Sequence, residues 1–371
     1  MAKFRKIGIL SSGGDAPGMN AAIRAATRRA LSQGLEVVGI LGGYAGLLGA
    51  ADEPDPEVLR QKYLRPFDTV SVSNIVTRGG TILYSSRCPE FKTPEGMAKA
   101  LKACHDYEID AVIAIGGDGT FRGATDLTNH GIPSIGIPAT IDNDITATEQ
   151  TIGFDTALNT ALTMFDALRD TAESHARCIV TEVMGNGCGF LSLYLALATG
   201  AISVAIPEIT FDREYAIKKI REAREECNKR GIIAICGEGM PKVGGVDYGE
   251  NFKEEIIART GIDTRYTKMG HIIRGGNPTL RDRLTATQMG VEAVNMLLEG
   301  RSNLVMCVNE NRISSADINF ALVLDKMYKN KLKDGDLEPF TGYQIAQMKA
   351  RCEARHAKIQ RLYKMAYDIS M

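Results

Sequence analysis

The sequence is 371 residues long, which is more than one ordinary core accommodates and suits two packed domains. Hydrophobic residues make up 44% of it and charged residues 24%, a composition typical of globular proteins and not of disordered ones. The formal net charge of -1 gives no electrostatic reason to expect a nucleic-acid or membrane-surface partner.

Two further bulk features indicate a cytoplasmic protein. The eight cysteines form no Cys-x-x-Cys pair and have no zinc-site spacing, so we interpret them as buried, reduced thiols. The N-terminal stretch "MAKFRKIGILSSGG" has too short an apolar part for a signal peptide. The apolar segment Phe190–Pro207 approaches the length of a membrane span, but Gly200 interrupts it. We therefore expect a buried helix that turns at Gly200 into a buried strand.

In chain order, short apolar runs alternate with amphipathic stretches. The runs predicted to be strands are 6–10, 36–41, 111–116, 134–138, 176–183, 202–207 and 231–238. The stretches predicted to be helices are 19–34, 95–108, 155–172 and 213–231. Strands buried on both faces and separated by helices predict an α/β fold with mostly parallel sheets covered by helices. The tail from about Asp317 is expected to be helical, and its basic face is interpreted as solvated rather than as a binding patch.

Two glycine loops follow predicted strands. In "SSGGDAPGMNAAIR", Gly13 and Gly14 precede a helix whose free N–H groups favour an anion, and the alternative is a tight turn without a ligand. In "IGGDGT", three glycines surround Asp118. A carboxylate would repel a phosphate there unless Mg²⁺ joined the two, because this cation takes carboxylate and phosphate oxygens together. The alternative for Asp118 is a structural helix cap.

A third loop, "PATIDNDI", contains two aspartates. If residues 141–144 are extended, the side chains of Asp142 and Asp144 project to the same side. Two adjacent carboxylates need a proton or a cation between them, so one can serve as a base for a hydroxyl group. An Asx turn is the alternative. Taken together, the three loops indicate phosphoryl transfer from a polyphosphate to an alcohol.

Arginines suited to an anionic substrate accompany these loops. They are Arg87, Arg169, Arg177, Arg265 and Arg274, and two of them flank His271. The ordered motifs "SSGGDAPGMNAAIR", "RGGTILYSSRCPEF", "IGGDGTFRGA", "PATIDNDI", "SHARCIVTEVMG" and "MGHIIRGGNP" resemble those of the 6-phosphofructokinase family over about residues 6–320. The resemblance implies two Rossmann-like domains: a nucleotide-binding domain of residues 1–153 and 273–318, and a sugar-phosphate-binding domain of residues 154–272. Residues 319–371 are then a helical extension expected to pack on the second domain.

The resemblance also implies roles for individual residues. ATP and Mg²⁺ would bind at Gly13, Tyr44, Arg87, Lys92, Asp118, Gly119 and Thr120, with Asp118 facing the metal. Asp142 would take the proton of the sugar 1-hydroxyl, with Thr140, Asp144 and Arg87 beside it. The sugar phosphate would be bound by Met184, Gly185, Glu238, His271 and Arg274, together with Arg177 and Arg265 of an adjacent subunit in a homotetramer. The product would be the glycolytic intermediate fructose 1,6-bisphosphate.

Two positions bear on the phosphoryl donor. Family members that use pyrophosphate carry an aspartate after the GGD and a lysine before the TIDND, where this chain has Gly119 and Ala139. Gly119 leaves room for the α-phosphate and the nucleoside, and Ala139 provides no charge for a short pyrophosphate. ATP is therefore the expected donor.

The chain departs from the family pattern at Asn186, where the family usually has an arginine near the transferred phosphoryl group. We expect the Asn186→Arg substitution to raise turnover, which initial rates at saturating substrates would measure. An unchanged turnover would indicate that another group compensates.

The effector site of the family is only half present. Arg24, Arg28, Arg169 and Lys229 are candidate effector ligands for an allosteric enzyme, but Thr69, Asn74, Ile202 and Cys227 replace the polar or charged ligands of bacterial members. For Arg24 and Arg28, salt bridges at a subunit interface are an equal alternative.

Three rival functions remain open on these grounds. A kinase of NAD or of a lipid diol shares the glycine–aspartate loop but lacks the other ordered motifs. A kinase of a related sugar phosphate, such as sedoheptulose 7-phosphate, is suggested by Asn186. A weakly active regulatory paralogue is opposed by the intact Asp118 and Asp142.

Overall fold

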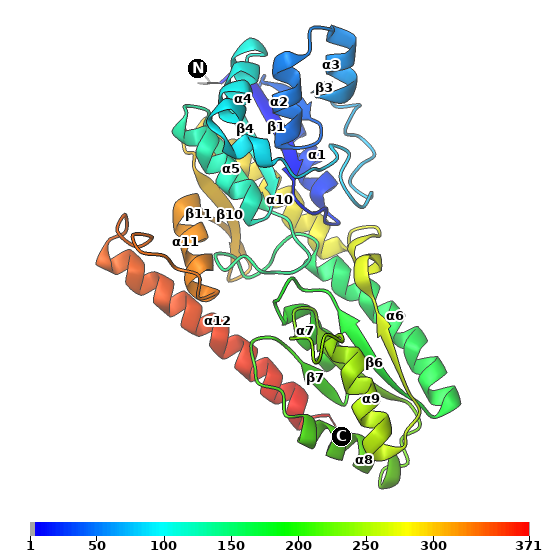
Figure 1. The fold of residues 1–371 in the computed structure, drawn as a ribbon. Helices are drawn as coiled ribbons and strands as arrows, with labels where there is room; N and C mark the ends of the chain where they lie inside the picture. The colour runs from blue at the N-terminus through cyan, green and yellow to red at the C-terminus, as the bar shows by residue number, and fades with distance from the viewer. Residues whose placement is uncertain (1–3, 371) are drawn as a thin grey trace. The chain divides into compact units, whose positions relative to one another are not determined.

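Figure 1 shows the computed structural model of the chain, which describes residues 4–370. Contacts between backbone positions divide the chain into two compact units. The first unit comprises Met1–Ile141, Ile145–Thr156 and Gly276–Cys352. The second unit comprises Asp142–Asp144, Ala157–Gly275 and Glu353–Met371.

The first unit is built on a seven-stranded sheet in the order β11-β10-β5-β4-β1-β2-β3. Its strands are β1 (Lys6–Ser12), β2 (Glu36–Ile40), β3 (Leu64–Phe67), β4 (Ala111–Gly116), β5 (Ser134–Pro138), β10 (Leu304–Asn309) and β11 (Arg312–Asp317). The two edge strands β3 and β11 run antiparallel to their neighbours, and the other pairs are parallel. Every residue of β4 and β5 is buried, as expected for strands covered by helices on both faces.

Helices cover this sheet. They are α1 (Met19–Ser32), α2 (Tyr44–Asp52), α3 (Pro56–Lys62), α4 (Pro94–Asp106), α5 (Asp118–Asn129), α10 (Leu280–Leu298) and α11 (Ile318–Tyr328), with a short 3-10 helix at Pro89–Lys92. Helices α1 and α10 pack closely, because a Cβ on Gly290 would lie 2.7 Å from the carbonyl oxygen of Ala22. Two long helices, α6 (Phe154–His175) and α12 (Gly342–Asp368), contribute residues to both units.

The second unit contains a four-stranded parallel sheet in the order β7-β8-β6-β9. Its strands are β6 (Cys178–Val183), β7 (Ser203–Ala205), β8 (Ile232–Gly237) and β9 (Thr264–Lys268). Its helices are α7 (Phe190–Thr199), α8 (Arg213–Glu225) and α9 (Tyr248–Thr260), with a 3-10 helix, η2, at Gly270–Arg274.

The predicted α/β class is confirmed, and each of the seven predicted strands lies within or overlaps a strand of the structure. The predicted turn between α7 and β7 is also confirmed, because Gly200 ends the helix at φ 61°. Among residues 4–370, no helix is long and apolar enough to cross a membrane.

The C-terminal segment differs from the expectation. Helix α11 packs against α5, and residues as far as Cys352 group with the first unit. Of the described residues after 318, those from 353 to 370 group with the second unit, so this segment does not pack on the second domain as one piece. The reason is that the apolar positions of α11, such as Phe320 and Leu324, are buried in the first unit.

A buried aspartate makes the stability of the first unit depend on pH. Asp282 in α10 is fully buried, and its Oδ2 accepts hydrogen bonds from the Thr156 amide (2.8 Å) and hydroxyl (2.6 Å). Burial raises the pKa of Asp282 to about 6, above its ordinary value. The folded state therefore keeps a proton that the unfolded chain loses, and this contribution to stability disappears as the pH rises through 6.

We expect the free energy of unfolding of the wild type to fall by about 1 kcal/mol between about pH 5 and about pH 7.5 because of this one group. Asp282→Asn cannot ionise, so its unfolding free energy should lack that fall. Urea unfolding of both proteins at the two pH values measures the difference. Parallel pH dependence of wild type and variant would contradict the assignment.

Candidate active site

Three loops start at one edge of the sheet of the first unit. Strand β1 ends at Ser12, which pairs with Gly116 of β4, and Gly116 in turn pairs with Pro138 of β5. The Thr120 hydroxyl donates to the Ser12 carbonyl (2.9 Å), and the Ala139 amide donates to the Gly116 carbonyl (2.9 Å). Parallel strands in this register bring the two glycine loops and the start of the third loop together, as expected for a ligand crevice at the carboxyl ends of the strands.

The glycines of these loops leave open space, which we call the glycine cradle and define by Gly13, Gly117 and Gly119. A Cβ on Gly117 or Gly119 would meet no atom within 4 Å, and one on Gly13 would meet only the Thr120 hydroxyl oxygen, at 3.7 Å. Gly117 is the N-cap of α5, so unsatisfied amide groups of that helix lie beside the cradle. A phosphate group fits both the space and the positive end of the helix dipole.

Asp118 is suited to hold a cation at the cradle. Its Oδ1 is buried without a hydrogen-bond partner, and its Oδ2 lies 3.7 Å from the Lys329 ammonium nitrogen. Within residues 4–370, no group of three or more His, Cys, Asp or Glu side chains is arranged to hold a metal. A single carboxylate with an orphaned oxygen fits Mg²⁺, which takes its remaining ligands from phosphate groups and water.

The structure adds a second carboxyl group that the sequence did not indicate. Asp325 of α11 is buried, and its Oδ1 accepts a hydrogen bond from the Thr146 amide (2.6 Å). Burial, and then the charge of Asp118, raise the pKa of Asp325 to about 8. Asp325 is therefore mostly neutral at pH 7, which avoids a second negative charge near Asp118. No local motif marks Asp325. It lies some two hundred positions after Asp118 in the chain, so the sequence does not show that the two residues are neighbours.

Three more predicted ATP ligands belong to the first unit. Tyr44 is buried, and its hydroxyl donates to the Thr120 carbonyl (2.6 Å). Tyr44 therefore stabilises the backbone of the loop that forms the glycine cradle. Burial raises the pKa of Tyr44 well above its ordinary value, which keeps this hydroxyl a donor. Arg87 and Lys92 are exposed. The segment before Arg87 is tied to the first loop, because the Ser85 hydroxyl donates to the Gly13 carbonyl (2.5 Å).

The two aspartates of the third loop belong to the second unit and differ from the expected geometry. Residues Ile141 and Asp142 form a turn, and Asn143 has a left-handed backbone with φ 51°. The extended conformation on which the alternation of side chains rested is therefore wrong. Asp142 and Asp144 are each only 8% exposed, so both carboxylates are still held in a largely dry environment. The preceding Thr140, in the first unit, accepts a hydrogen bond at its carbonyl from the Thr151 hydroxyl (2.6 Å).

The predicted sugar ligands of the second unit lie where two strands end together. Val183 of β6 pairs with Gly237 of β8, and Met184 and Gly185 follow the first strand as Glu238 follows the second. The Glu238 Oε2 accepts hydrogen bonds from the amides of Gly185 (3.1 Å) and Asn186 (3.0 Å). Glu238 thus fixes the loop after β6.

The local backbone and one side-chain contact favour asparagine at position 186. Its backbone lies in the left-handed region at φ 51°, which asparagine tolerates better than most residues. Its side-chain amide donates to Asp144 Oδ2 at 3.4 Å. Asn186 therefore supplies a neutral donor to one of the two loop carboxylates.

The four residues predicted to grip a phosphate are separated in the chain. His271 and Arg274 lie in η2, which follows the carboxyl end of β9. Arg177 precedes β6 and Arg265 lies near the start of β9, and both form ion pairs with Asp263 (2.6 and 3.2 Å). A strand of six residues is about 20 Å long, so Arg177 lies at the opposite edge of the sheet from the Glu238 loop. One chain therefore does not bring these four residues together.

The candidate effector ligands are divided between the units. Arg24 and Arg28 lie in α1 of the first unit, where the Arg24 Nε is buried without a hydrogen-bond partner. Arg169 and Lys229 belong to the second unit, and the Arg169 guanidinium donates to the Thr199 carbonyl at the end of α7.

Comparisons with known proteins agree on one family. A profile of the family described as phosphofructokinase matches residues 6–297. The chain is 45% identical over 319 residues to an ATP-dependent 6-phosphofructokinase of Halalkalibacterium halodurans, which covers 86% of this chain and 94% of the relative. It is 46% identical over 329 residues to ATP-dependent 6-phosphofructokinase 1 of Clostridium perfringens, with 89% and 97% covered.

Solved structures agree with this result. The structure of phosphofructokinase from Saccharomyces cerevisiae is similar, with a TM-score of 0.80 and 29% sequence identity. The match covers 90% of this chain and 47% of the yeast chain, so this chain spans about half the length of that protein. A pyrophosphate-dependent phosphofructokinase from Nitrosospira multiformis matches with a TM-score of 0.73, and the match covers 85% of this chain and 83% of that one. Its sequence identity is only 17%, so this similarity concerns the fold alone.

Proposed function

The chain belongs to the phosphofructokinase family, and from this membership we propose that it is an ATP-dependent 6-phosphofructokinase. It transfers the γ-phosphoryl group of ATP to the 1-hydroxyl of fructose 6-phosphate in glycolysis. The observation that carries the proposal is about 45% identity to relatives of this name over nearly their whole length. Gly119 supports ATP over pyrophosphate, since the open space at this glycine accommodates a longer polyphosphate.

In the first unit, we propose that the glycine cradle, Thr120 and the exposed Arg87 and Lys92 bind the phosphates of ATP. Mg²⁺ held by Asp118 would neutralise charge on the transferred group. The orphaned Oδ1 of Asp118 supports this role, because a buried carboxylate oxygen without a donor is stabilised by a cation.

In the second unit, we propose that Asp142 accepts the proton of the sugar 1-hydroxyl while that oxygen bonds to the γ-phosphorus and the bond to ADP breaks. Asp144, together with Thr140 of the first unit, orients the hydroxyl group. Met184, Gly185 and Glu238 bind the sugar ring. The 6-phosphate is bound by His271 and Arg274 of one subunit and by Arg177 and Arg265 of a neighbouring subunit. Two subunits are needed because one chain does not bring these four residues together.

The remaining proposals concern organisation and control. We propose that the first unit binds the nucleotide and the second the sugar phosphate, that the enzyme is cytoplasmic, and that it is a homotetramer with shared sites. The arrangement of Arg177 and Arg265 supports a shared site. Allosteric control through Arg24, Arg28, Arg169 and Lys229 stays a prediction.

One assay tests the proposal. The purified protein is given ATP, Mg²⁺ and fructose 6-phosphate, and formation of fructose 1,6-bisphosphate is followed. Parallel reactions contain pyrophosphate in place of ATP, or sedoheptulose 7-phosphate in place of fructose 6-phosphate. We expect the highest kcat/KM with ATP and fructose 6-phosphate. A clear preference for either replacement, or activity only after a second protein is added, would contradict the proposed function.

A further inference from the structure

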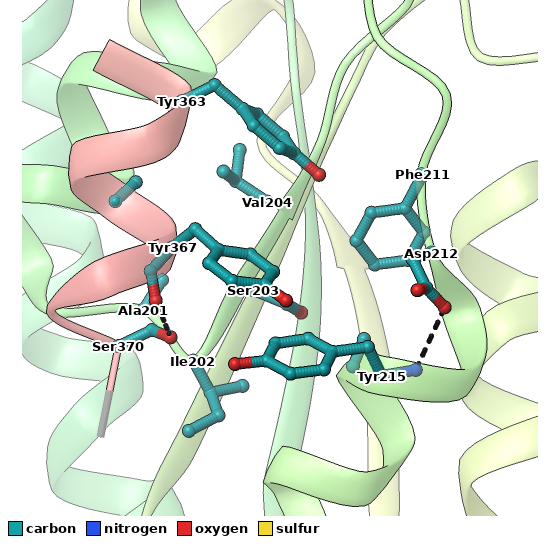
Figure 2. Close-up of a pocket in the computed structure, with 12 residues that line it drawn as sticks. Ala201, Ile202, Ser203, Val204, Phe211, Asp212, Tyr215, Tyr363, Tyr367 and Ser370 are labelled. Atoms are coloured by element: carbon teal, nitrogen blue, oxygen red, sulfur yellow. Dashed lines mark hydrogen bonds between the residues drawn. The ribbon is translucent and has the colours of Figure 1, made fainter. Parts of the chain in front are cut away.

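The last helix of the chain lies outside the residues that the family profile matches. The family profile ends at residue 297, whereas α12 spans Gly342–Asp368. Figure 2 shows how its end is fixed in the second unit, with Tyr363, Tyr367 and Ser370 facing Val204 of β7, Phe211 and Tyr215. This part of α12 is therefore an integral part of the second unit and not a loose tail.

Two interactions make this anchor firm. The rings of Tyr215 and Tyr367 stack with centroids 4.4 Å apart. The buried Lys219 ammonium group donates to the Tyr367 carbonyl (2.8 Å) and to the Ser370 hydroxyl (2.6 Å), which satisfies carbonyl and hydroxyl groups at the end of the helix. An anchored helix can hold the side chains of its preceding turns in fixed positions.

One of those side chains, Arg355, reaches the aspartate loop. Arg355 is only 9% exposed, and its Nη2 donates to the carbonyl of Asn143, which lies between Asp142 and Asp144. The guanidinium carbon also lies 4.6 Å from the centre of the Phe190 ring. A buried guanidinium group is costly unless it is paired and oriented, and stacking with a hydrogen bond to a carbonyl orients it.

The Cys188 thiol is influenced by the charges of both Arg355 and Asp144. Burial raises the pKa of the Cys188 thiol to about 12, the positive charge of Arg355 opposes this rise, and the charges of Glu208 and Asp144 add to it. The direct contact of Arg355 with the loop is the hydrogen bond to the Asn143 carbonyl.

The contacted carbonyl belongs to the strained position of the loop. Asn143 has a left-handed backbone, which costs less for asparagine than for most residues with a side chain but is still less favourable than a right-handed one, and it separates two carboxylates. A cationic donor at this carbonyl stabilises the turn and partly offsets the charge of the carboxylates. We propose that Arg355 is a positioning residue that holds the Asp142–Asp144 turn in its reactive conformation. The catalytic consequence rests on the proposed function of Asp142.

The test replaces Arg355 by methionine, which keeps much of the length but removes the charge and the donor, and by lysine, which keeps the charge. Arg361→Met on the exposed side of the same helix is the matched control. We expect Arg355→Met to lower kcat about 10- to 100-fold with KM for ATP changed less than about 2-fold, since the charged hydrogen bond that is lost is made to the aspartate loop and not to the glycine cradle. Arg355→Lys should retain intermediate activity, and Arg361→Met should behave as wild type.

A second readout does not depend on activity. Hydrogen exchange of the peptide covering residues 140–148 should be faster in Arg355→Met than in wild type and unchanged in Arg361→Met. A wild type without fructose 6-phosphate kinase activity would refute the proposed function, and the exchange rates would still decide the role of Arg355. Wild-type kcat and wild-type exchange in Arg355→Met, or in Arg355→Lys if the methionine variant does not fold, would overturn the inference.

Discussion

Replacing Asp142 by asparagine is expected to lower kcat by about 10²–10⁴-fold, the usual contribution of a general base. The asparagine has nearly the same size, so the turn around Asn143 should persist, but the amide cannot accept the proton of the sugar hydroxyl. KM for ATP should change little, because the cradle belongs to the first unit. Steady-state rates with fructose 6-phosphate as the varied substrate measure the effect.

The matched control is Asp170→Asn, an exposed aspartate on α6 of the second unit. This variant loses the same charge away from the loop and should keep wild-type turnover. If Asp142→Asn turned over at a near-normal rate, Asp142 would lose the role of base, and Asp144 would become the carboxylate to test next.

Placing a carboxylate in the cradle is expected to have the second largest effect. Gly119→Asp should lower kcat/KM for ATP by about 100-fold or more, because a charge about 4 Å from a phosphate costs about 4 kcal/mol at an effective dielectric constant of about 20. The substitution itself should fit, since a Cβ at Gly119 meets no atom within 4 Å and the glycine has no positive φ.

Gly119→Ala separates the charge from the added volume. The alanine fills the same Cβ position without a charge, so most of the ATP activity should remain. Rates of both variants at a fixed fructose 6-phosphate concentration, with ATP varied, give the comparison. Equal losses in the two variants would mean that the space at Gly119, and not electrostatic repulsion, controls the use of ATP.

Much of the candidate site could be predicted because it depends on short-range order. The strands β1, β4 and β5 are continuous apolar runs, and glycines follow them immediately, so both the strands and their loops can be recognised from neighbouring residues. Asp118 could be assigned to a cation for the same reason, because its neighbours are glycines that leave room for a phosphate.

Other strands could not be predicted from local pattern. β9 has the sequence TRYTK with a mostly accessible surface, and no residue of β11 is buried. Such strands lack the alternation or the apolar run that marks a buried strand, since they are stabilised by pairing with a neighbour that is distant in sequence. Their positions follow from the sheet and not from their own residues.

The sequence alone determined the fold class, the positions along the chain of the strands that carry the loops, and the residues that give the loops their chemistry. These depend on backbone sterics and apolar periodicity, which act over a few residues. Only the tertiary structure decided the left-handed turn at Asn143, the buried Asp325 on Thr146 and the contact of Arg355 with Asn143, which joins positions 212 residues apart. Contacts of this kind depend on the path of the whole chain, because packing, and no local pattern, brings their partners together.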